Sequence, residues 1–575
     1  MRGAAEIRLI GRLMGYAVRK KPSIVPITAL GVLSSGAEVL AMVSIIPLGL
    51  LAAGGSLPDG SPWHRIPMAL GLTADTKFFV LLFLSIFLFR MVSNIAALVL
   101  SARTIQTLFA HFATQAFSAF VRHLSFQDIV RQQIGHFFSI AGDESNRGAQ
   151  IVGGVMRIVP VIFLFAAYGA FIFYQSWKGG LALIGLIVCM ALALKGAFRR
   201  SLTLGRRQSE EARTVNTLFF DTLGGLRTVR GFTAENFVIK GYRGLIERYV
   251  HTSFLTEAIS QLTQAPIMVL LALVLAFILF GVDNADLVSN MPLFFAGVMM
   301  FTRLMPMASF AMESAMKLTA NLKAGSHIDE MLSAVQDAER RETLPPFPEE
   351  RINRIEFDRV NFRYSPDTPP ILSEFSRTLE AGHSYAITGP SGAGKSSLVD
   401  LLLKFYSPDG GAIRVNGHDI GKLSTDSLRR HMILAEQAVR IFYGTVLENV
   451  QFDDPAARER AESALQLVGL TDLLSTLPQG LNTMLTFQGS NFSGGQRQRV
   501  GIARALVRTA DVLILDESTN ALDQNTRKAI LDTLLTSYRD RILIFITHDP
   551  YVMERVDHVI ELGPPVHPRE GIAAQ

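Results

Sequence analysis

One short segment has the residue types and spacing that hold a phosphate group. Gly389-Pro390-Ser391-Gly392-Ala393-Gly394-Lys395-Ser396 fits the pattern G-x-x-x-x-G-K-[ST] between the strand-like run SYAIT and the helical stretch SSLVDLLLKF. Glycines let backbone N–H groups close around phosphate oxygens, and the N-terminus of the next helix adds positive potential. We therefore predict that Lys395 reaches the β- and γ-phosphates of a nucleotide and that Ser396 ligates magnesium. We also include Ser397 among the predicted nucleotide-binding residues.

A second segment places two acidic residues at the end of an apolar strand. In VLILDE, Asp516 is placed to hold the shell of a magnesium ion and Glu517 to polarise an attacking water. Phosphoryl transfer depends on metal, phosphate clamp and water-orienting group more than on covalent chemistry. By itself such a strand end is weak evidence, but it gains weight because it follows a phosphate loop in the same chain.

The elements that must position these residues follow from the pattern of the C-terminal part. From Ile352 onward, short β-branched or aromatic runs (IEFDRVNFRY, SYAITG, DVLILDE, ILIFITH) alternate with helical stretches. This predicts an α/β domain with a largely parallel sheet over residues 352–575. Residues 333–351 are polar, charged and proline-rich without apolar periodicity, so we predict a linker there.

The preceding residues have a different composition. The whole chain of 575 residues is 49% hydrophobic and only 18% charged, with a mean hydropathy of +0.29, and the apolar residues concentrate in long runs. Because roughly 20 helical residues span about 30 Å of hydrocarbon, we predict an all-α, six-helix transmembrane domain over residues 1–332. The predicted spans are about 24–51, 78–104, 151–176, 179–198, 258–282 and 292–316.

The loops between these spans predict the topology. The N-terminus contains Arg2, Arg8, Arg12, Arg19, Lys20 and Lys21, and basic residues stay on the cytoplasmic side. The long polar stretches 104–150 and 199–257 belong on the same side, which places the C-terminal domain in the cytoplasm. The excess of 55 basic over 50 acidic residues is then partly a topology signal, and we predict no nucleic-acid partner. The single Cys189 excludes a disulfide framework and a Cys-based zinc site.

The first residues allow three interpretations. The arginine-rich start is typical of mitochondrial transit peptides, and a charged start before an apolar run is typical of signal peptides. The first apolar run is too long for a signal peptide, and apolar residues recur at helical spacing opposite the arginines: Ile7, Leu9, Ile10, Leu13, Met14 and Ala17. We therefore predict an amphipathic helix in the membrane interface, in a bacterial inner membrane, with an organellar membrane as the alternative.

Two features inside the predicted spans bear on cargo. Glu38 and Arg90 lie near the middle of consecutive spans, where charges are costly, so we expect them to pair or to face a shared polar cavity. A structural ion pair with no part in cargo recognition is the alternative. The sixth span is rich in methionine, which suits a cavity for variable apolar cargo but is more often a packing residue: Met299, Met300, Met305, Met307, Met312 and Met316.

Between the two nucleotide motifs lies a more specific segment. Phe492-Ser493-Gly494-Gly495-Gln496 closely resembles the signature of ATP-binding cassette (ABC) ATPases, whose usual first residue is leucine. Tyr364 in NFRY resembles the family's adenine-stacking aromatic residue, and Gln437 resembles its Q-loop glutamine. Asn520-Ala521-Leu522-Asp523 resembles the D-loop, with Asn for the more usual serine, and His548 in FITHD resembles the switch histidine.

This resemblance implies the ligands and the site residues. It implies ATP and Mg²⁺, with Glu517, His548 and Gln437 in catalysis and with Ser396, Gln437 and Asp516 around the metal. It adds residues of the signature and the D-loop to the nucleotide site: Ser493, Gly494, Gly495, Gln496 and Asp523. In the family, the signature completes the ATP site of a partner, so we expect a dimer, most simply of two identical chains.

The membrane half resembles ABC exporters, which have six spans ahead of one cassette. The resemblance implies a first coupling helix near 125–131, and residues 224–237 resemble the segment that follows the second coupling helix. Two departures concern coupling. The stretch TMLTFQG (483–489) has no carboxylate where exporters often carry an acidic segment, and the chain ends soon after VDHVIELG, where the family usually has a last helix.

These features predict an ATP-hydrolysing exporter of a hydrophobic or amphipathic cargo, which is a drug, a lipid or a small peptide such as a lasso-type antimicrobial peptide. Its expected partners are a second copy of itself, membrane lipid and the cargo. An importer built on the exporter fold for siderophore-like cargo is one alternative, and an ATP-gated membrane protein that does not pump is another. The predicted spans exclude the DNA-repair and translation members of the family.

Overall fold

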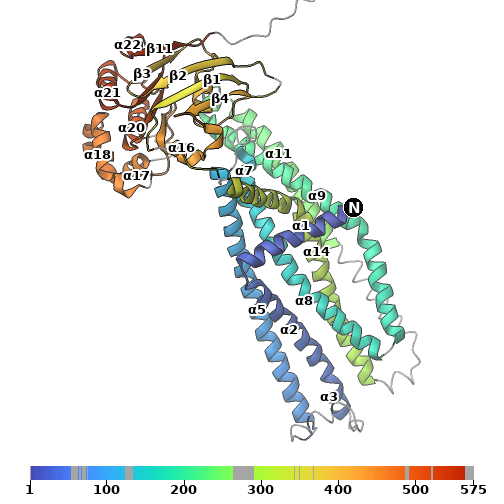
Figure 1. Ribbon diagram of the computed structural model, residues 1–575. Coiled ribbons are helices and arrows are strands. Elements are labelled where there is room, and N and C mark those ends of the chain that lie inside the picture. The colour runs from blue at the N-terminus through green and yellow to red at the C-terminus, as the bar shows by residue number, and fades with distance from the viewer. Residues whose placement is uncertain are drawn as a thin grey trace, which may run out of the picture. The chain divides into compact units, whose positions relative to one another are not determined.

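The chain divides into two compact units with a boundary between Ala338 and Glu339 (Figure 1). The computed structural model describes residues 2–563 apart from 53–62, 64–66, 68–72, 74, 124–133, 176, 263–290, 342–343, 349, 367, 453, 486–490 and 520–521. We call the first part the helical unit and the second the α/β unit.

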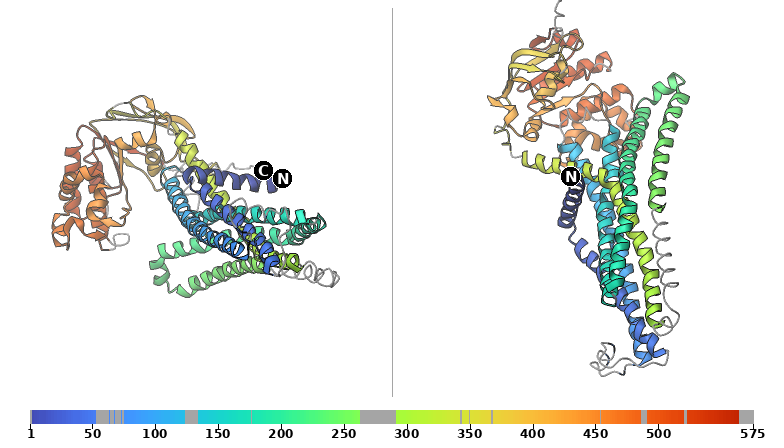
Figure 2. Two further views of the ribbon diagram at one scale, coloured as in Figure 1. Left: turned by 90° about the horizontal axis from the view of Figure 1, so that it is seen from below. Right: turned by 90° about the vertical axis from the view of Figure 1, so that its right-hand side faces the viewer.

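Most of the helical unit is made of long helices that run alongside one another, and the N-terminal helix crosses them (Figures 1 and 2). Helix α2 packs against α5 and α8, and α9 packs against α11. The helices are α1 (Arg2–Lys20), α2 (Ile24–Val43), α3 (Ile45–Ala52), α5 (Thr76–Ser118), α7 (Ile134–Ser139), α8 (Ser145–Gln175), α9 (Trp177–Gly224), α10 (Leu226–Gly231), α11 (Glu235–Leu262) and α14 (Met291–Arg341).

Within the described residues, three helical stretches are long and apolar enough to cross a membrane: Ile24–Leu51, Thr76–Arg122 and Phe137–Ala170. They overlap the first three predicted spans. The predicted fourth and sixth spans lie within α9 and α14. Most of the predicted fifth span, 258–282, and the expected coupling segment 125–131 lie outside the described residues.

The apolar face of α1 packs on protein at its centre, where we expected it to rest on lipid. Leu13 and Ala17 are fully buried, whereas Ile7 is 72% exposed. A side chain at Gly325 of α14 would approach Leu13 to 3.2 Å, so this glycine makes room for the helix. Arg12 also pairs with Asp329 of α14 at 2.6 Å. The prediction of an amphipathic helix is confirmed, but the centre of its apolar face is covered by other helices of the protein.

The two charges within the spans form an ion pair, as one of our hypotheses stated. Nη2 of Arg90 lies 2.9 Å from Oε2 of Glu38, and Nε of Arg90 donates to the same oxygen at 3.1 Å. The Glu38 side chain is only 3% exposed. Pairing offsets part of the cost of holding each charge away from water.

The described methionines of the last span are packing residues. Met312 is 9% exposed and Met316 is 2% exposed, and Met307 packs on the cluster around Leu164 and Tyr168. The side chains of Met299, Met300 and Met305 are not among the side chains that the structure describes.

The polar segment after this span differs from our prediction of a linker over 333–351, because α14 continues to Arg341. The last residues of α14, SAVQDAERR, are mostly good helix formers. Their high helix propensity favours a helix even though the segment lacks an apolar periodicity. Pro345 and Pro346 follow shortly afterwards, and proline cannot continue a helix.

The α/β unit contains two main sheets. An antiparallel sheet has the order β2-β1-β4-β5, formed by β1 (Arg354–Phe362), β2 (Leu372–Glu380), β4 (Gly410–Val415) and β5 (His418–Asp419). A parallel sheet has the order β11-β3-β10-β9-β6, formed by β3 (Ser384–Thr388), β6 (Met432–Ala435), β9 (Val512–Asp516), β10 (Ile542–Ile546) and β11 (His558–Glu561). Strands β7 (Gly444–Thr445) and β8 (Met484–Leu485) form a short third pair.

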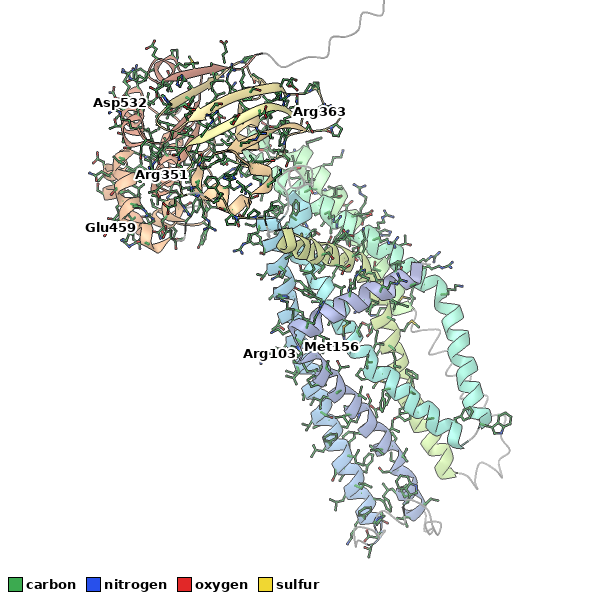
Figure 3. The ribbon with its side chains drawn as sticks, in the orientation of Figure 1. Arg103, Met156, Arg351, Arg363, Glu459 and Asp532 are labelled. Carbon is green, nitrogen blue, oxygen red and sulfur yellow. The ribbon has the colours of Figure 1, made fainter. Side chains whose placement is uncertain are left out.

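Helices cover the parallel sheet and connect its strands. They are α15 (Lys395–Leu402), α16 (Thr425–His431), α17 (Val446–Gln451), α18 (Arg458–Leu467), α19 (Thr471–Thr476), α20 (Gly494–Val507), α21 (Gln524–Ser537) and α22 (Pro550–Met553). Polar side chains on the outer helices, such as Glu459 of α18 and Asp532 of α21, point outward (Figure 3).

The core of this unit lies on both faces of the parallel sheet. Alternate residues of a strand point to opposite faces, so a strand covered on both sides is apolar throughout. In β9, Val512 and Ile514 pack in the cluster that contains α15, whereas Leu513 and Leu515 pack in the cluster that contains α20 and α21. This explains why apolar and polar residues do not alternate in the run VLIL.

Breaking the Glu38–Arg90 pair is expected to destabilise the protein. Arg90→Ala should lower the free energy of unfolding by about 3–5 kcal/mol, because it leaves a buried carboxylate without its partner. Thermal unfolding of the detergent-solubilised protein measures this change. The double reversal Glu38→Arg with Arg90→Glu should recover much of the loss.

The matched control is Arg12→Ala, which removes a pair whose arginine is 65% exposed. Surface pairs contribute about 0–1 kcal/mol, so this variant should unfold close to the wild-type temperature. Equal losses from the two alanine variants would contradict the stabilising role of the membrane pair.

Candidate functional site

The predicted site residues meet at one edge of the parallel sheet. The phosphate loop follows β3, Asp516 and Glu517 lie at the end of β9, His548 follows β10 and Gln437 follows β6. Strands of a parallel sheet all end on the same side, and ligands of such folds bind outside the carboxyl ends. Four motifs that are far apart in the sequence therefore share one edge.

The phosphate loop has a backbone that requires glycine. Gly394 has a φ of +95°, and a side chain there would come within 2.8 Å of Ile371 Cγ2. A side chain at Gly389 would lie 2.6 Å from the carbonyl oxygen of Leu562. Lys395 Nζ donates to the carbonyl oxygens of Gly389 at 2.7 Å and Pro390 at 3.0 Å. Its charge is therefore already held over the loop that would receive a phosphate.

The two acidic residues differ in their surroundings. Burial raises the pKa of Asp516 to about 6, and the nearby carboxylates of Glu517 and Asp400 add to the rise. Glu517 has a φ of +42°, which is unusual for a residue other than glycine, and its N–H donates to the carbonyl of Ile546 at 3.0 Å. Gln437 Nε2 donates to Glu517 Oε2 at 2.7 Å, so the predicted water-orienting and metal-binding residues are in contact.

The histidine after β10 stands on a fixed turn. His548 is exposed, and the next residue, Asp549, caps α22 by accepting from the N–H of Tyr551 at 3.0 Å. Arg527 pairs with Asp549 at 2.9 Å. These contacts fix the backbone on one side of His548 and leave its ring on the surface at the same sheet edge.

The signature segment begins the next helix. Ser493 caps α20 by accepting from the N–H of Gln496 at 3.2 Å, and the Gln496 side chain accepts from the N–H of Ser493 at 2.8 Å. This reciprocal capping box leaves Gly494 and Gly495 in the first turn. Phe492 is only 3% exposed and belongs to the core, which explains how phenylalanine replaces the more usual leucine.

Asp523 has a similar local role. It caps α21 by accepting from the N–H of Thr526 at 3.0 Å, and this backbone hydrogen bond holds the pKa of Asp523 below its usual range. Asn520 and Ala521 lie outside the described residues. So do residues 486–489, which form the second half of the stretch TMLTFQG that has no carboxylate. The segment after Gly563, where we expected a helix to be missing, is likewise outside them.

Tyr364 contacts the helix that follows the phosphate loop. Its hydroxyl lies 2.9 Å from Ser397 Oγ and donates to Asp400 Oδ2 at 3.2 Å. Our sequence reasoning missed Asp400. The available signal was an acidic residue within the otherwise apolar run LVDLLL of a helix that faces a core.

The residues present fit a nucleotide with a divalent cation. The loop forms a cradle that added side chains would fill, and the carboxylates beside it repel one another in the absence of a cation. Among the described residues, no group of three or more His, Cys, Asp or Glu side chains is placed to bind a metal.

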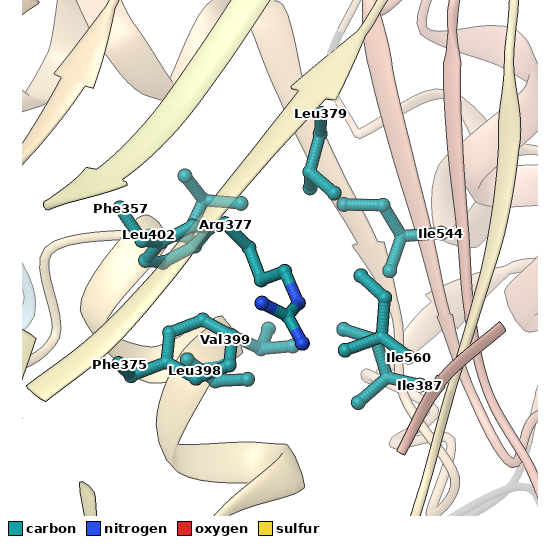
Figure 4. Close-up of a pocket in the computed structure, with 10 residues that line it drawn as sticks. All are labelled: Phe357, Phe375, Arg377, Leu379, Ile387, Leu398, Val399, Leu402, Ile544 and Ile560. Carbon is teal, nitrogen blue, oxygen red and sulfur yellow. The ribbon is translucent and has the colours of Figure 1, made fainter. Parts of the chain in front are cut away.

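The small apolar cavity between the two sheets is a different feature (Figure 4). It has a volume of about 10 Å³ and is lined by Phe357, Phe375, Ile387 and Ile544, with the Arg377 side chain reaching toward it. This is room for about one water molecule, so the cavity is a packing defect and no nucleotide site.

Filling the phosphate loop should remove nucleotide binding. We expect Gly394→Ala to weaken ATP binding at least tenfold, because the new methyl group collides with Ile371 and the backbone must leave its positive φ. Equilibrium binding of radiolabelled ATP measures this loss. Gly382→Ala is the control, because Gly382 also has a positive φ of +88° but no neighbour nearer than 3.8 Å. If both variants lost the same affinity for ATP, backbone strain alone would explain the loss, and the collision with Ile371 would not.

Family comparisons match both parts of the chain. Residues 30–302 match the model described as the ABC transporter transmembrane region, and residues 372–520 match the model described as ABC transporter. The second match contains the phosphate loop, the signature and the acidic strand end.

Relatives with assigned activities are similar over most of the chain. The ATP-dependent lipid A-core flippase of Burkholderia pseudomallei (strain 1710b) is 30% identical over 411 residues, which are 70% of this chain and 67% of that protein. The flippase of the same name from Pectobacterium atrosepticum is 29% identical over 440 residues, which are 75% of this chain and 74% of that protein.

Among solved structures, a bacterial Atm1-family ABC exporter with ATP bound superposes with a TM-score of 0.75 at 23% identity. The superposition covers 95% of this chain and 93% of that one, so the two share their fold. The motif order, the matches over both parts and the identity to the flippases show that the chain belongs to the ABC transporter family, as an integral membrane protein that couples ATP hydrolysis to transport.

Proposed function

We propose that this chain is one half of a homodimeric exporter that moves a lipid or a similar amphipathic molecule across a bacterial inner membrane. The observation that carries the proposal is the assembly of Lys395, Asp516 and Glu517 at one sheet edge, fused to membrane-spanning helices. The similarity to lipid A-core flippases supports a lipid as the cargo in preference to a drug or a peptide.

We propose one role for each site residue. Lys395 binds the β- and γ-phosphates, and the loop glycines present N–H groups to the same oxygens. Ser396, Gln437 and Asp516 would hold Mg²⁺, which when bound supplies positive charge to the phosphate oxygens. Glu517 orients the attacking water, and its hydrogen bond from Gln437 holds the carboxylate in place. His548 lies at the same edge to contact the γ-phosphate, and Tyr364 stacks on the base.

The number of motifs per chain supports a dimer. The chain has one phosphate loop and one signature, and in the family each signature completes the ATP site of the other chain. The partner's Ser493 and the partner's Gly495 would then face Lys395, with Asp523 near the same junction. Phe232 and Phe237, each 82% exposed in the segment after the expected second coupling helix, are available to contact another chain.

An apolar groove in the helical unit supports an amphipathic cargo. Its volume is about 450 Å³, and Leu33 and Leu40 of α2, Ile86 and Phe89 of α5 and Phe163 of α8 line it. Ligand pockets usually measure about 300–1,000 Å³.

The topology in the membrane is proposed from the sequence alone. We propose that the basic N-terminus and the α/β domain, from about residue 352, lie in the cytoplasm, because basic residues flank the spans on that side.

A reconstituted system tests the proposed cargo. Purified protein in proteoliposomes is given lipids with a fluorescent headgroup, and an impermeant reductant then reports the fraction of label in each leaflet. ATP-dependent movement of label between leaflets is the expected result. ATP hydrolysis with no lipid movement, together with ATP-dependent uptake of a peptide or a drug, would overturn the lipid assignment.

The assignment of Glu517 predicts a separation of binding from hydrolysis. Glu517→Gln should keep the affinity for ATP within about threefold and lower kcat at least a hundredfold, because the amide cannot polarise the water. Phosphate release and ATP binding measure the two effects. Glu459→Gln, on the exposed surface of α18, makes the same chemical change and should retain full activity. A Glu517→Gln protein that hydrolyses ATP at the wild-type rate would refute the assignment.

A further inference from the structure

The aromatic residue at the nucleotide site is tied to the phosphate-binding helix by hydrogen bonds. The Tyr364 hydroxyl lies 2.9 Å from Ser397 Oγ and donates to Asp400 Oδ2 at 3.2 Å. Ser397 and Asp400 both belong to α15, which starts at Lys395. Ser397 is 4% exposed, so this contact lies inside the unit.

Two further rings confine the tyrosine ring. Phe362 meets it edge-on with ring centres 5.0 Å apart and an interplanar angle of 78°, and Tyr406 does so at 5.0 Å and 81°. Edge-to-face packing is the favourable geometry for such pairs. With the hydroxyl anchored and two sides packed, the ring is held in one orientation before a ligand arrives.

Asp400 organises this arrangement through both its side chain and its backbone. Its carboxylate accepts from Tyr364, and its carbonyl oxygen accepts from the N–H of Phe405 at 2.8 Å and the N–H of Tyr406 at 3.4 Å. The residue therefore fixes Tyr364 directly and also fixes the turn that presents Tyr406. It lies on the same helix as Lys395 and Ser396.

A half-buried carboxylate in an apolar helix needs a compensating contact. Burial disfavours the charged carboxylate and so raises the pKa of Asp400, and the hydrogen bond from Tyr364 opposes that effect. An apolar residue in the run LVDLLL would avoid the desolvation cost. The hydrogen bond to Tyr364 gives this acidic residue a use that packing alone does not supply.

We propose that Asp400 is a positioning residue for nucleotide binding, which holds the Tyr364 ring ready to stack on the base and links it to the helix that binds the phosphates. The proposal rests on the proposed role of Tyr364 in the function above. A ring that is already oriented loses less conformational freedom on binding, so the contact acts on affinity. It leaves the chemical step to Glu517 and its neighbours.

Steady-state ATP hydrolysis by the full-length protein in nanodiscs tests this proposal. Asp400→Leu and Tyr364→Phe should each raise KM for ATP about three- to tenfold and leave kcat within twofold. The double variant should raise KM no further than the stronger single one, because both changes remove the same contact. GTP should show the same factors, since stacking on an aromatic ring depends little on which base is bound.

Two controls separate positioning from a loss of folding. Asp400→Asn keeps an oxygen acceptor for the Tyr364 hydroxyl, so its KM should stay within twofold of the wild type. Asp532→Leu makes the apolar change on the exposed face of α21 and should leave KM unchanged. Thermal unfolding of each variant reports the fraction of folded protein, which scales kcat but does not alter KM.

Unchanged KM in both Asp400→Leu and Tyr364→Phe would overturn the proposal, as would KM increases that multiply in the double variant. A fall in kcat alone, in parallel with the folded fraction, would assign Asp400 a purely structural role and would also overturn it. Failure of the wild-type protein to hydrolyse ATP would instead refute the proposed function itself.

Discussion

The carboxyl ends of parallel strands must meet at one edge of a sheet, and the site of this protein depends on that constraint. The phosphate loop, the acidic strand end, the exposed histidine and the glutamine are separated by long stretches of sequence, yet they follow β3, β9, β10 and β6 of one sheet. The sheet holds this edge in place because apolar residues pack on both of its faces. Hydrophobic burial therefore supplies the rigidity that the polar site needs.

Charge is used differently in the two units. In the helical unit, Glu38 and Arg90 neutralise each other within an apolar environment, where an isolated charge would be very costly. At the sheet edge, by contrast, burial raises the pKa of Asp516, and the carboxylates of Glu517 and Asp400 add to the rise. Lys395 opposes this rise without cancelling it, so the second arrangement suits a site that takes up a cation together with a nucleotide.

The sequence was most informative where local chemistry determines the backbone. The glycines of the phosphate loop and the apolar run of β9 each indicated their structure, because few other sequences fit those conformations. The pairing of Glu38 with Arg90 was also predictable, since the cost of unpaired charges leaves few alternatives.

Contacts that depend on tertiary packing were not predictable. The apolar face of α1 did not indicate that it would pack on α14 at Gly325. The polar composition after residue 333 did not indicate that the helix continues to Arg341. The contact of Asp400 with Tyr364 joins two separate parts of the chain, which no local pattern encodes.

The central claim is that these strand ends form one site for ATP with Mg²⁺. An experimental structure of the full-length Glu517→Gln variant with ATP and Mg²⁺ tests it most directly. We expect the γ-phosphate within hydrogen-bond distance of Lys395 Nζ, with the metal next to Ser396 and Asp516. Nucleotide bound elsewhere on the protein, with the loop at residues 389–396 unchanged and empty, would contradict it.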